Sequence, residues 1–414
     1  MTDRKFQTPP GTSDVLPETA VARERLEAAA RKIFDRAGYG RIETPTYEAT
    51  ELFARGVGEA TDVVQKEMFT FEADDRSYTL RPEGTAPTVR AYMEHGMHKL
   101  PQPVKLWYLS SFFRKETPQA GRYRQFWQVG VEAIGSADPA VDAEVILLLA
   151  ELLEALGARD VELVIASLGQ PEHRAAYRDE LTAYLRANED QLSEEVISRI
   201  DLNPLRAFDA KHEPTQRVMA KAPRLIDRLP QEDLDHFASV QDLLRAADLS
   251  YTVDTTLVRG LDYYTRTLFE FKSGALEAAQ NTLGGGGRYD GLAEVLGGPA
   301  TPGVGWAAGV ERMLMAATQA PQVEPAVDLF VAYEPAHKVD AFKLAADARR
   351  TGHSVRLELA GRSVKGQLKQ ASRIRPRYVA IFGDDGVQLR DRDGGEDKLV
   401  APETVMHHIR GNIL

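Results

Sequence analysis

The spacing of hydrophobic residues changes several times along this chain, and each change predicts a different element. Between residues 18 and 37, apolar side chains recur every three or four positions, which predicts a helix that ends at Gly38. Residues 65–134 alternate between apolar and polar as strands do, interrupted by a helix near 86–97. Helical spacing returns at 142–157. The first part of the chain therefore combines strands with flanking helices.

The middle of the chain has a different character. Residues 171–248 are rich in Ala, Leu, Glu, Asp and Arg and have few β-branched pairs, which predicts a helical insertion. Strand character returns at 250–258 and 267–272. The sequence therefore predicts strands on both sides of a helical insertion.

The C-terminal part reads as a separate unit. Residues 317–327 contain two prolines and no regular spacing, which predicts a linker. Beyond it, strand and helix patterns alternate as in a small α/β domain. A chain of 414 residues is also long for one hydrophobic core. We therefore expect two domains, 1–325 and 328–414.

Composition narrows the class of protein. Hydrophobic residues make up 43% of the chain and charged residues 27%, as in an ordinary globular protein. Cysteine is absent, which excludes disulfides and thiolate metal sites. Neither a signal-peptide pattern nor a run long enough to cross a bilayer occurs, so we expect a cytosolic protein without a membrane partner.

Charge is distributed unevenly. The net charge of −11 argues against a generic basic nucleic-acid coat. Residues 328–414, however, carry 15 Lys/Arg against 12 Asp/Glu, whereas residues 1–327 carry 36 against 50. Within 349–377 a single acid, Glu358, accompanies nine basic residues: Arg349, Arg350, Arg356, Arg362, Lys365, Lys369, Arg373, Arg375 and Arg377. This run is either a solvated helix face or a local phosphate-binding surface.

Two predicted strands carry polar side chains on one face. From Arg122 to Ala133, alternation places Gln128, Gly130 and Glu132 on one face and apolar residues on the other. The apolar face suits a core. The polar face suits a binding site, although a solvated sheet face has the same pattern.

The preceding strand repeats this arrangement. Tyr108, Arg114 and Glu116 share a face, and an antiparallel pairing through the turn at 117–121 would bring Arg114 close to Arg122. Two converging guanidinium groups suit a triphosphate. The Glu116 carboxylate could orient an arginine, accept a base amino group or help to hold Mg²⁺.

Glu83 and Thr85 stand two residues apart, where a strand pattern gives way to a helix pattern. A carboxylate and a hydroxyl in this arrangement can bind an ammonium group together. The alternative is a helix cap, which uses the same residue types.

The densest polar cluster lies at 257–265. Arg259, Asp262, Tyr263 and Tyr264 surround Gly260, a combination that suits a pocket for a polar ligand better than an apolar core. Arg259 and Tyr264 differ in strand parity, so a regular strand cannot direct both at one ligand. We therefore predict a bend at 260–262.

Two glycine-rich segments follow. The run at 284–287 allows close approach of backbone but lacks the spacing of a P-loop or a dinucleotide fingerprint. Residues 303–309 read as a strand that enters a helix, with Arg312 in its first turns. Histidine pairs occur at 95/98 and 407/408, but no His-Glu-x-x-His is present, so we expect no metal site of this kind.

Together these segments resemble a class II aminoacyl-tRNA synthetase, and in particular the histidyl-tRNA synthetase family. Three segments are similar to the class motifs and two to signatures of the histidine enzymes: 39–48, 113–126 and 309–312, then 259–264 and 286–291. The resemblance implies an α+β fold. It implies a class II antiparallel-sheet catalytic domain over 1–325, with the helical insertion, and an anticodon-binding α/β domain over 328–414.

The resemblance also implies roles for individual residues. Positions that hold histidine in the family match Glu83, Gly84, Thr85, Gln128, Glu132, Tyr263 and Tyr264. Positions that hold ATP match Arg114, Glu116, Arg122 and Arg312. Arg259 matches the arginine that reaches the α-phosphate, and with Arg114 it is expected to carry the chemistry. Expected tRNA contacts are Gln119, Arg362, Lys365, Lys369 and Arg373.

The implied reaction joins L-histidine to tRNA(His), with ATP and Mg²⁺, in a homodimer. One alternative is the non-catalytic regulatory subunit of ATP phosphoribosyltransferase, which resembles the synthetase core but typically lacks the C-terminal domain. Another is a class II synthetase for threonine or proline, which lacks the signature at 259–264.

Overall fold

The computed structural model describes residues 6–58, 61–277, 281–318, 327–392 and 396–410. The chain forms two compact units, Met1–Thr318 and Gln319–Leu414. Most of the expected linker, 319–326, lies outside the described residues. Among the described residues, no helix is both long and apolar enough to cross a membrane.

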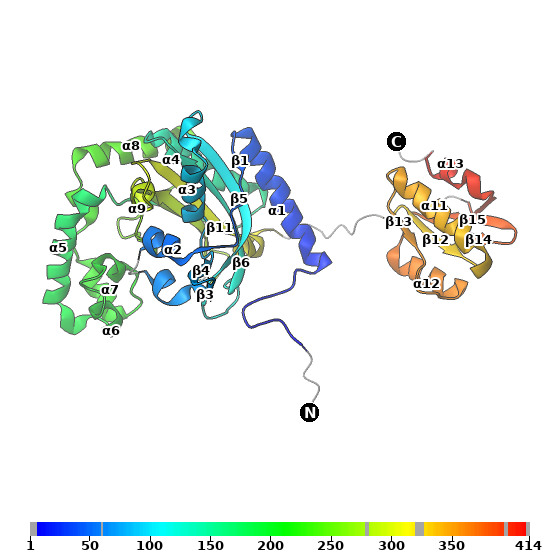
Figure 1. The fold of residues 1–414 in the computed structure, drawn as a ribbon, viewed down its shortest axis with the longest axis horizontal. Coiled ribbons are helices and arrows are strands. Elements are labelled where there is room, and N and C mark those ends of the chain that lie inside the picture. Colours follow the sequence, from blue (N-terminus) through cyan, green and yellow to red (C-terminus); the bar gives the residue numbers. More distant parts are fainter. Residues whose placement is uncertain (1–5, 59–60, 278–280, 319–326, 393–395, 411–414) are drawn as a thin grey trace, which may run out of the picture. The chain divides into compact units, whose positions relative to one another are not determined.

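The first unit is built around an eight-stranded sheet (Figure 1). Its six central strands are antiparallel, and the edge strands β1 and β8 pair in parallel. The order across the sheet is β1 (Gly40–Arg41), β5 (Val104–Phe113), β6 (Gln125–Ile134), β11 (Gly303–Gly309), β10 (Thr282–Arg288), β9 (Thr265–Ser273), β7 (Val161–Ser167) and β8 (Thr252–Val253). This antiparallel α+β architecture confirms the expected fold class.

Four helices cover one face of the sheet and form the main core with it. They are α1 (Pro17–Arg36), α4 (Pro139–Ala155), α8 (Gln231–Ala246) and α10 (Val310–Ala316). On β6 the buried residues of this core are Val129, Val131 and Ala133, which is the predicted apolar face. The predicted alternation of β6 is therefore confirmed.

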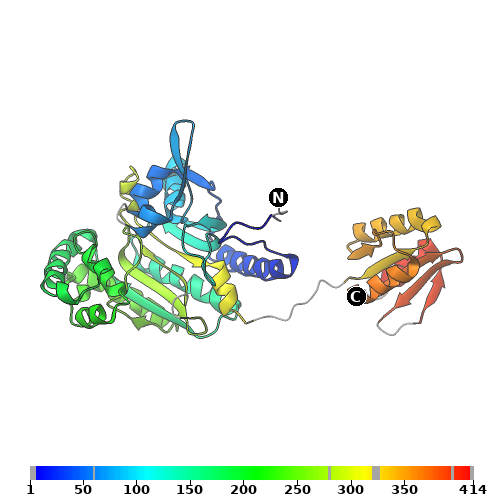
Figure 2. The same ribbon diagram turned by 90° about the horizontal axis from the view of Figure 1, so that it is seen from below.

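The other elements of this unit lie outside that core. A small sheet contains β2 (Tyr47–Ala49), β4 (Arg76–Leu80) and β3 (Phe69–Ala73). Near it are α2 (Thr50–Val57), α3 (Thr85–Glu94) and α9 (Leu292–Val295). The insertion contributes α5 (Pro171–Ala187), α6 (Glu194–Ile197) and α7 (Glu213–Ala220), which form the green lobe beside the large sheet in Figure 2.

The structure corrects one prediction about the middle of the chain and adds detail to another. The strand expected at 250–258 is wrong beyond Val253, because the Asp254 carboxylate accepts hydrogen bonds from the backbone and side chain of Thr256 and turns the chain. The helical insertion was expected to reach residue 248. Helices α5 to α8 fill this range, but α8 buries Phe237, Val240 and Leu244 in the main core, whereas the helices before it pack in a second core with β7 and β9.

The second unit is a small α/β fold, as predicted, and it contains a five-stranded sheet. The sheet order is β13 (Val355–Leu357), β12 (Leu329–Tyr333), β14 (Tyr378–Gly383), β15 (Gly386–Asp391) and β16 (Lys398–Val400). The first three strands are parallel and the last two antiparallel. Its helices are α11 (Lys338–Arg350), α12 (Val364–Ile374) and α13 (Val405–Arg410).

Candidate functional site

A cavity of about 520 Å³ lies in the first unit, and we refer to it as the main cavity. It is lined from β6, β10 and β11, from the turn between β5 and β6, and from the segment before β9. Eleven of the predicted site residues line it: Glu83, Gly84, Thr85, Arg114, Glu116, Arg122, Gln128, Arg259, Tyr263, Tyr264 and Arg312. Side chains separated by more than 200 residues in sequence therefore share one space.

The segment 257–264 contains no strand, but has a bend at Gly260 and a turn at Asp262–Tyr263. This irregular backbone directs Arg259, Tyr263 and Tyr264 into the same cavity, despite their different parity. The predicted bend is confirmed.

A carboxylate on β9 holds the Arg259 guanidinium. Its Nη1 contacts the Glu270 carboxylate, in an ion pair with limited exposure. A side chain at Gly285 would begin 3.2 Å from Arg259 Nη1, so the glycine of β10 leaves room for the cation. Burial opposes the charge, but the neighbouring Glu270 outweighs it and holds the pKa of Arg259 above its ordinary value.

Four cations, Arg114, Arg122, Arg259 and Arg312, line the main cavity, and we call them the arginine group. Glu116 lies between two of them, with an oxygen 2.5 Å from Arg122 Nε and the other 3.7 Å from Arg114 Nη1. The predicted convergence of Arg114 and Arg122 is therefore confirmed. The alternation had placed Arg122 within strand β6. The strand begins only at Gln125, so Arg122 lies in the turn before it.

Two backbone carbonyl groups fix the Arg312 side chain. Its Nε donates to Gly121 O at 3.0 Å and its Nη1 to Thr282 O at 3.1 Å. Burial lowers the pKa of Arg312, and the repulsion from Arg122 lowers it further. Like charges collected in this way favour a ligand with several negative charges.

Glu132 is fully buried and is surrounded by three hydroxyl groups. Thr85 Oγ1 donates to it at 2.8 Å, Tyr108 OH at 3.3 Å and Tyr289 OH at 2.6 Å. Burial raises the pKa of Glu132 to about 8, in spite of these hydrogen bonds. The alternation had placed this carboxylate on the pocket face. The structure places it on that face but behind the residues that line the cavity.

Glu83 and Gln128 offer further acceptors. Glu83 accepts hydrogen bonds from the backbone N–H groups of Thr85 and Ala86, at 2.7 and 3.0 Å, so it also caps α3. The helix-cap interpretation of Glu83 is therefore confirmed. The capping carboxylate also lines the cavity, and its binding of an ammonium group stays a prediction. Gln128 Oε1 is buried and has no hydrogen-bond partner among the described residues. An unsatisfied acceptor beside a buried carboxylate suits a ligand that donates hydrogen bonds.

Comparison with known proteins connects this cavity to a family. The family model for histidyl-tRNA synthetase matches residues 11–313. The chain belongs to the histidyl-tRNA synthetase family. A histidine–tRNA ligase of Desulforamulus reducens is 46% identical over 408 residues, covering 95% of this chain and 96% of the relative. One from Rubrobacter xylanophilus is 44% identical and covers 98% and 100%.

Solved structures of the family agree with the fold. The apo histidyl-tRNA synthetase of S. aureus is 34% identical, with a TM-score of 0.81, and covers 98% of this chain and 100% of that one. A Bacillus halodurans structure described as an ATP phosphoribosyltransferase regulatory subunit/histidyl-tRNA synthetase has a TM-score of 0.65 over 92% of this chain and all of that chain, but is only 22% identical. This second likeness concerns the fold alone.

Tyr108 and Tyr289 were missed by the sequence argument, although both contact Glu132. The ring of Tyr108 fills the space left by two glycines, since a Cβ at Gly84 or at Gly130 would lie 2.4 Å from Tyr108 Cζ. The alternation had placed Gly130 between Gln128 and Glu132 on the polar face of β6, where a glycine leaves a gap. The gap holds a ring, and Tyr108 on the facing strand was the available signal.

The expected tRNA contacts lie in two places. Gln119 is exposed and forms a backbone bridge with Arg122 at the turn between β5 and β6. In the second unit, Lys365, Lys369 and Arg373 are exposed on α12 at four-residue spacing, and therefore share one helix face. Arg362 precedes that helix and contacts the Glu358 carboxylate at 3.1 Å.

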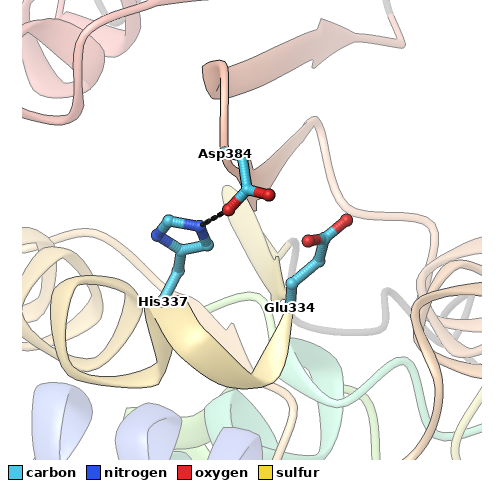
Figure 3. A group of neighbouring side chains, drawn as sticks. All are labelled: Glu334, His337 and Asp384. Atoms are coloured by element: carbon cyan, nitrogen blue, oxygen red, sulfur yellow. Dashed lines mark hydrogen bonds and ion pairs between the residues drawn. The ribbon is translucent and has the colours of Figure 1, made fainter.

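A different group of side chains resembles a metal site (Figure 3). Glu334, His337 and Asp384 have ligand atoms within 4.8 Å of one another, the only such group of three within the described ranges. His337 Nε2 lies 3.0 Å from Asp384 Oδ1. Two of the three residues are exposed, and exposed acidic groups are common without an ion. The group therefore does not support a metal centre.

Proposed function

We propose that this protein is a histidine–tRNA ligase, which activates L-histidine with ATP and transfers it to the 3′ end of tRNA(His). One observation carries the proposal. A single cavity joins the arginine group, suited to a triphosphate, to carboxylate, amide and phenol groups, suited to a small amino acid. Membership of the histidyl-tRNA synthetase family supports it.

The histidine would bind at the side of Glu83 and Tyr264. Its ammonium fits the acceptors of Glu83, Thr85 and Gln128, with the backbone of Gly84 beside them. The unsatisfied Gln128 oxygen supports this placement. Its imidazole can donate to and accept from Glu132 and Tyr264, and Tyr263 packs 4.7 Å from Tyr264, centre to centre.

In the first step, a carboxylate oxygen of histidine attacks the α-phosphorus of ATP, and pyrophosphate leaves. The step needs positioning and charge neutralisation more than a protein nucleophile. Arg259 and Arg114 would neutralise the charge at the α-phosphate. Arg122 and Arg312 would hold the other phosphates, and Glu116 would orient Arg122.

The carboxylates present fit a magnesium ion that arrives with ATP. Mg²⁺ takes one or two carboxylates together with phosphate oxygens, and Glu116 and Glu270 both line the main cavity. When bound, the ion would neutralise charge on the phosphates. Both carboxylates contact arginines, so they also compensate part of the positive charge of the arginine group before the nucleotide binds.

In the second step, a terminal ribose hydroxyl of the tRNA attacks the adenylate carbonyl, and AMP leaves. We assign catalysis to residues 1–325 and anticodon binding to 328–414. The exposed basic face of α12, together with Arg362, would contact RNA phosphates, and Gln119 would approach the acceptor end.

The proposal includes a homodimer and a cytoplasmic location. Tyr47, Phe71 and Tyr78 form a cluster of aromatic rings on the small sheet, and Tyr47 and Phe71 remain 51% and 41% exposed. An apolar surface of this kind suits burial against a second copy. A cysteine-free enzyme that uses ATP and tRNA suits the cytoplasm.

The regulatory-subunit alternative is less supported. A non-catalytic paralogue does not have to bind and neutralise a triphosphate, so it does not need four arginines that line one cavity. Here Arg114, Arg122, Arg259 and Arg312 all line it, and the C-terminal unit is present.

Histidine-dependent exchange of pyrophosphate into ATP tests the proposal. Histidine alone should support exchange, and threonine and proline should not. Exchange with threonine or proline instead of histidine would refute the assignment. The same enzyme preparation should then charge tRNA(His) when it is given ATP and histidine.

A further inference from the structure

The pairing of β9 with β10 shifts its register near the cavity. Gly287 lies opposite Leu268, but the next residue, Arg288, lies opposite Thr265. Residues 266–267 therefore have no partner on β10. An irregularity of this kind bends a strand and changes the direction of nearby side chains. The tyrosines of the main cavity come directly before it in sequence.

Arg266 has the unusual backbone at this irregularity. Its φ is 42°, in the left-handed region that side chains other than asparagine and aspartate rarely adopt. Its N–H donates to Gly169 O at 2.9 Å, and its carbonyl accepts from Leu168 N at 2.7 Å. The strand thus turns from β10 toward the entrance of the insertion. Such a conformation persists where its surroundings fix it.

The Arg266 side chain supplies that fixing contact. Arg266 is nearly buried, and its Nε donates to Asp233 Oδ1 at 3.0 Å. Its Nη2 contacts Glu232, so both partners lie in the first turn of α8. The bond to Asp233 is charge-assisted and out of water, and is therefore strong and directional, whereas the Glu232 side chain is exposed.

Asp233 also joins the two ends of the insertion. It is fully buried, and its second oxygen accepts from Gln170 N at 3.1 Å and lies 2.7 Å from His173 Nδ1. Gln170 and His173 mark the entrance to the insertion, and Asp233 marks its exit. One carboxylate therefore connects both ends with the first residues of β9.

We propose that Arg266 is a positioning residue for histidine recognition: clasped by Asp233, it holds the start of β9 so that Tyr263 and Tyr264 face the main cavity. This inference rests on the proposed function. It assigns the insertion a part in amino-acid binding, because a change at its two ends reaches the tyrosines through Asp233 and Arg266.

Two substitutions at one position separate backbone from side chain. Arg266→Gly removes the clasp and relieves the strained backbone, whereas Arg266→Gln removes the clasp and keeps a side chain at that φ, so an effect of the clasp itself should appear in both variants. In pyrophosphate exchange, both should raise KM for histidine about tenfold and change KM for ATP less than about twofold. Arg228→Gln is the matched control, because Arg228 pairs with Glu180 on the insertion surface, away from β9. It should change neither constant.

Asp233→Asn tests the clasp without altering Arg266. It should raise KM for histidine by a similar factor, and the double variant with Arg266→Gln should be no worse than either single variant. Multiplying effects would overturn the proposal. A wild-type KM for histidine in Arg266→Gly, or equal increases for histidine and ATP, would overturn it too. If the wild-type protein fails to use histidine, the proposed function has failed instead.

Discussion

The two groups that meet in the main cavity are stabilised in opposite ways. The arginine group stays partly exposed, with Arg114, Arg122 and Arg259 side chains at 22%, 43% and 21% exposure. The groups around Glu132 are buried and bonded to one another, with Tyr108 at 4% and Tyr289 at 2%. Water reaches the cations and is excluded from the carboxylate.

This difference corresponds to two tasks. Partly solvated cations with carboxylate partners can exchange those partners for phosphates at little cost. A buried carboxylate that three hydroxyls hold in place cannot rearrange freely, so a ligand that bonds to it must match its geometry. Tight packing therefore suits the choice of amino acid, and the open arginine group suits binding and release of a nucleotide.

Removal of a cation should have the largest effect. We expect Arg259→Ala to lower the rate of histidine activation at least about a thousandfold, because the charge developing at the α-phosphate loses a positioned cation. Single-turnover formation of the adenylate measures this. Arg186→Ala, which breaks a surface pair with Glu189, should leave the rate unchanged. A near-normal rate for Arg259→Ala would remove it from the chemistry.

Substitution of the buried carboxylate should act mainly on one substrate. Glu132→Gln should raise KM for histidine about 10- to 100-fold, since an amide replaces the carboxyl group that the three hydroxyls hold in place, and leave KM for ATP nearly unchanged. The matched control is Glu144→Gln, where Glu144 also accepts a tyrosine hydroxyl, from Tyr39 at 2.9 Å, outside the cavity. Equal changes for both substrates would show that the two groups are not independent.

Charge reversal on α12 should have an intermediate effect. Lys365→Glu with Lys369→Glu should weaken tRNA charging about tenfold at moderate salt and reduce the salt dependence of binding, without altering pyrophosphate exchange. Lys338→Glu with Lys343→Glu, on α11 of the same unit, is the control for net charge. If both pairs act alike, α12 is a solvated face and not an RNA contact.

The smallest effect concerns stability and pH. Burial raises the pKa of Glu132 from 4.5 to about 8, so the folded protein binds this proton more tightly than the unfolded chain. The stability contributed by the protonated form is complete below 4.5 and is lost as the pH rises to about 8. Thermal unfolding of wild type and Glu132→Gln should therefore diverge in favour of the variant between these values. A constant difference would show that Glu132 ionises normally.

Much of the fold was accessible from local patterns. Helices α1 and α11 and the alternation of β6 follow from apolar spacing alone, because each buries one face against the core. The bend at 260–262 followed from requiring Arg259 and Tyr264 to share a ligand. These predictions depend on neighbours in sequence, which the sequence displays directly.

The remaining features depend on partners distant in sequence. The main-core packing of α8 was invisible, since its composition matches that of the helices before it. The pairing of Tyr289 with Glu132 crosses 157 residues. The early end of β8 depended on a single local turn at Asp254, which a run of β-branched residues concealed.

The position of β11 sets the order in which the protein can become active during synthesis. This strand lies between β6 and β10, and its pairing with β6 places Gly309 opposite Gln128. The ribosome makes β5 and β6 long before it makes β11, and pairing across such a distance forms late. A nascent chain that ends before Gly303 carries Arg114, Gln128 and Arg259 but lacks β11, which forms one wall of the main cavity. The main cavity can therefore be completed only after β11 has been made.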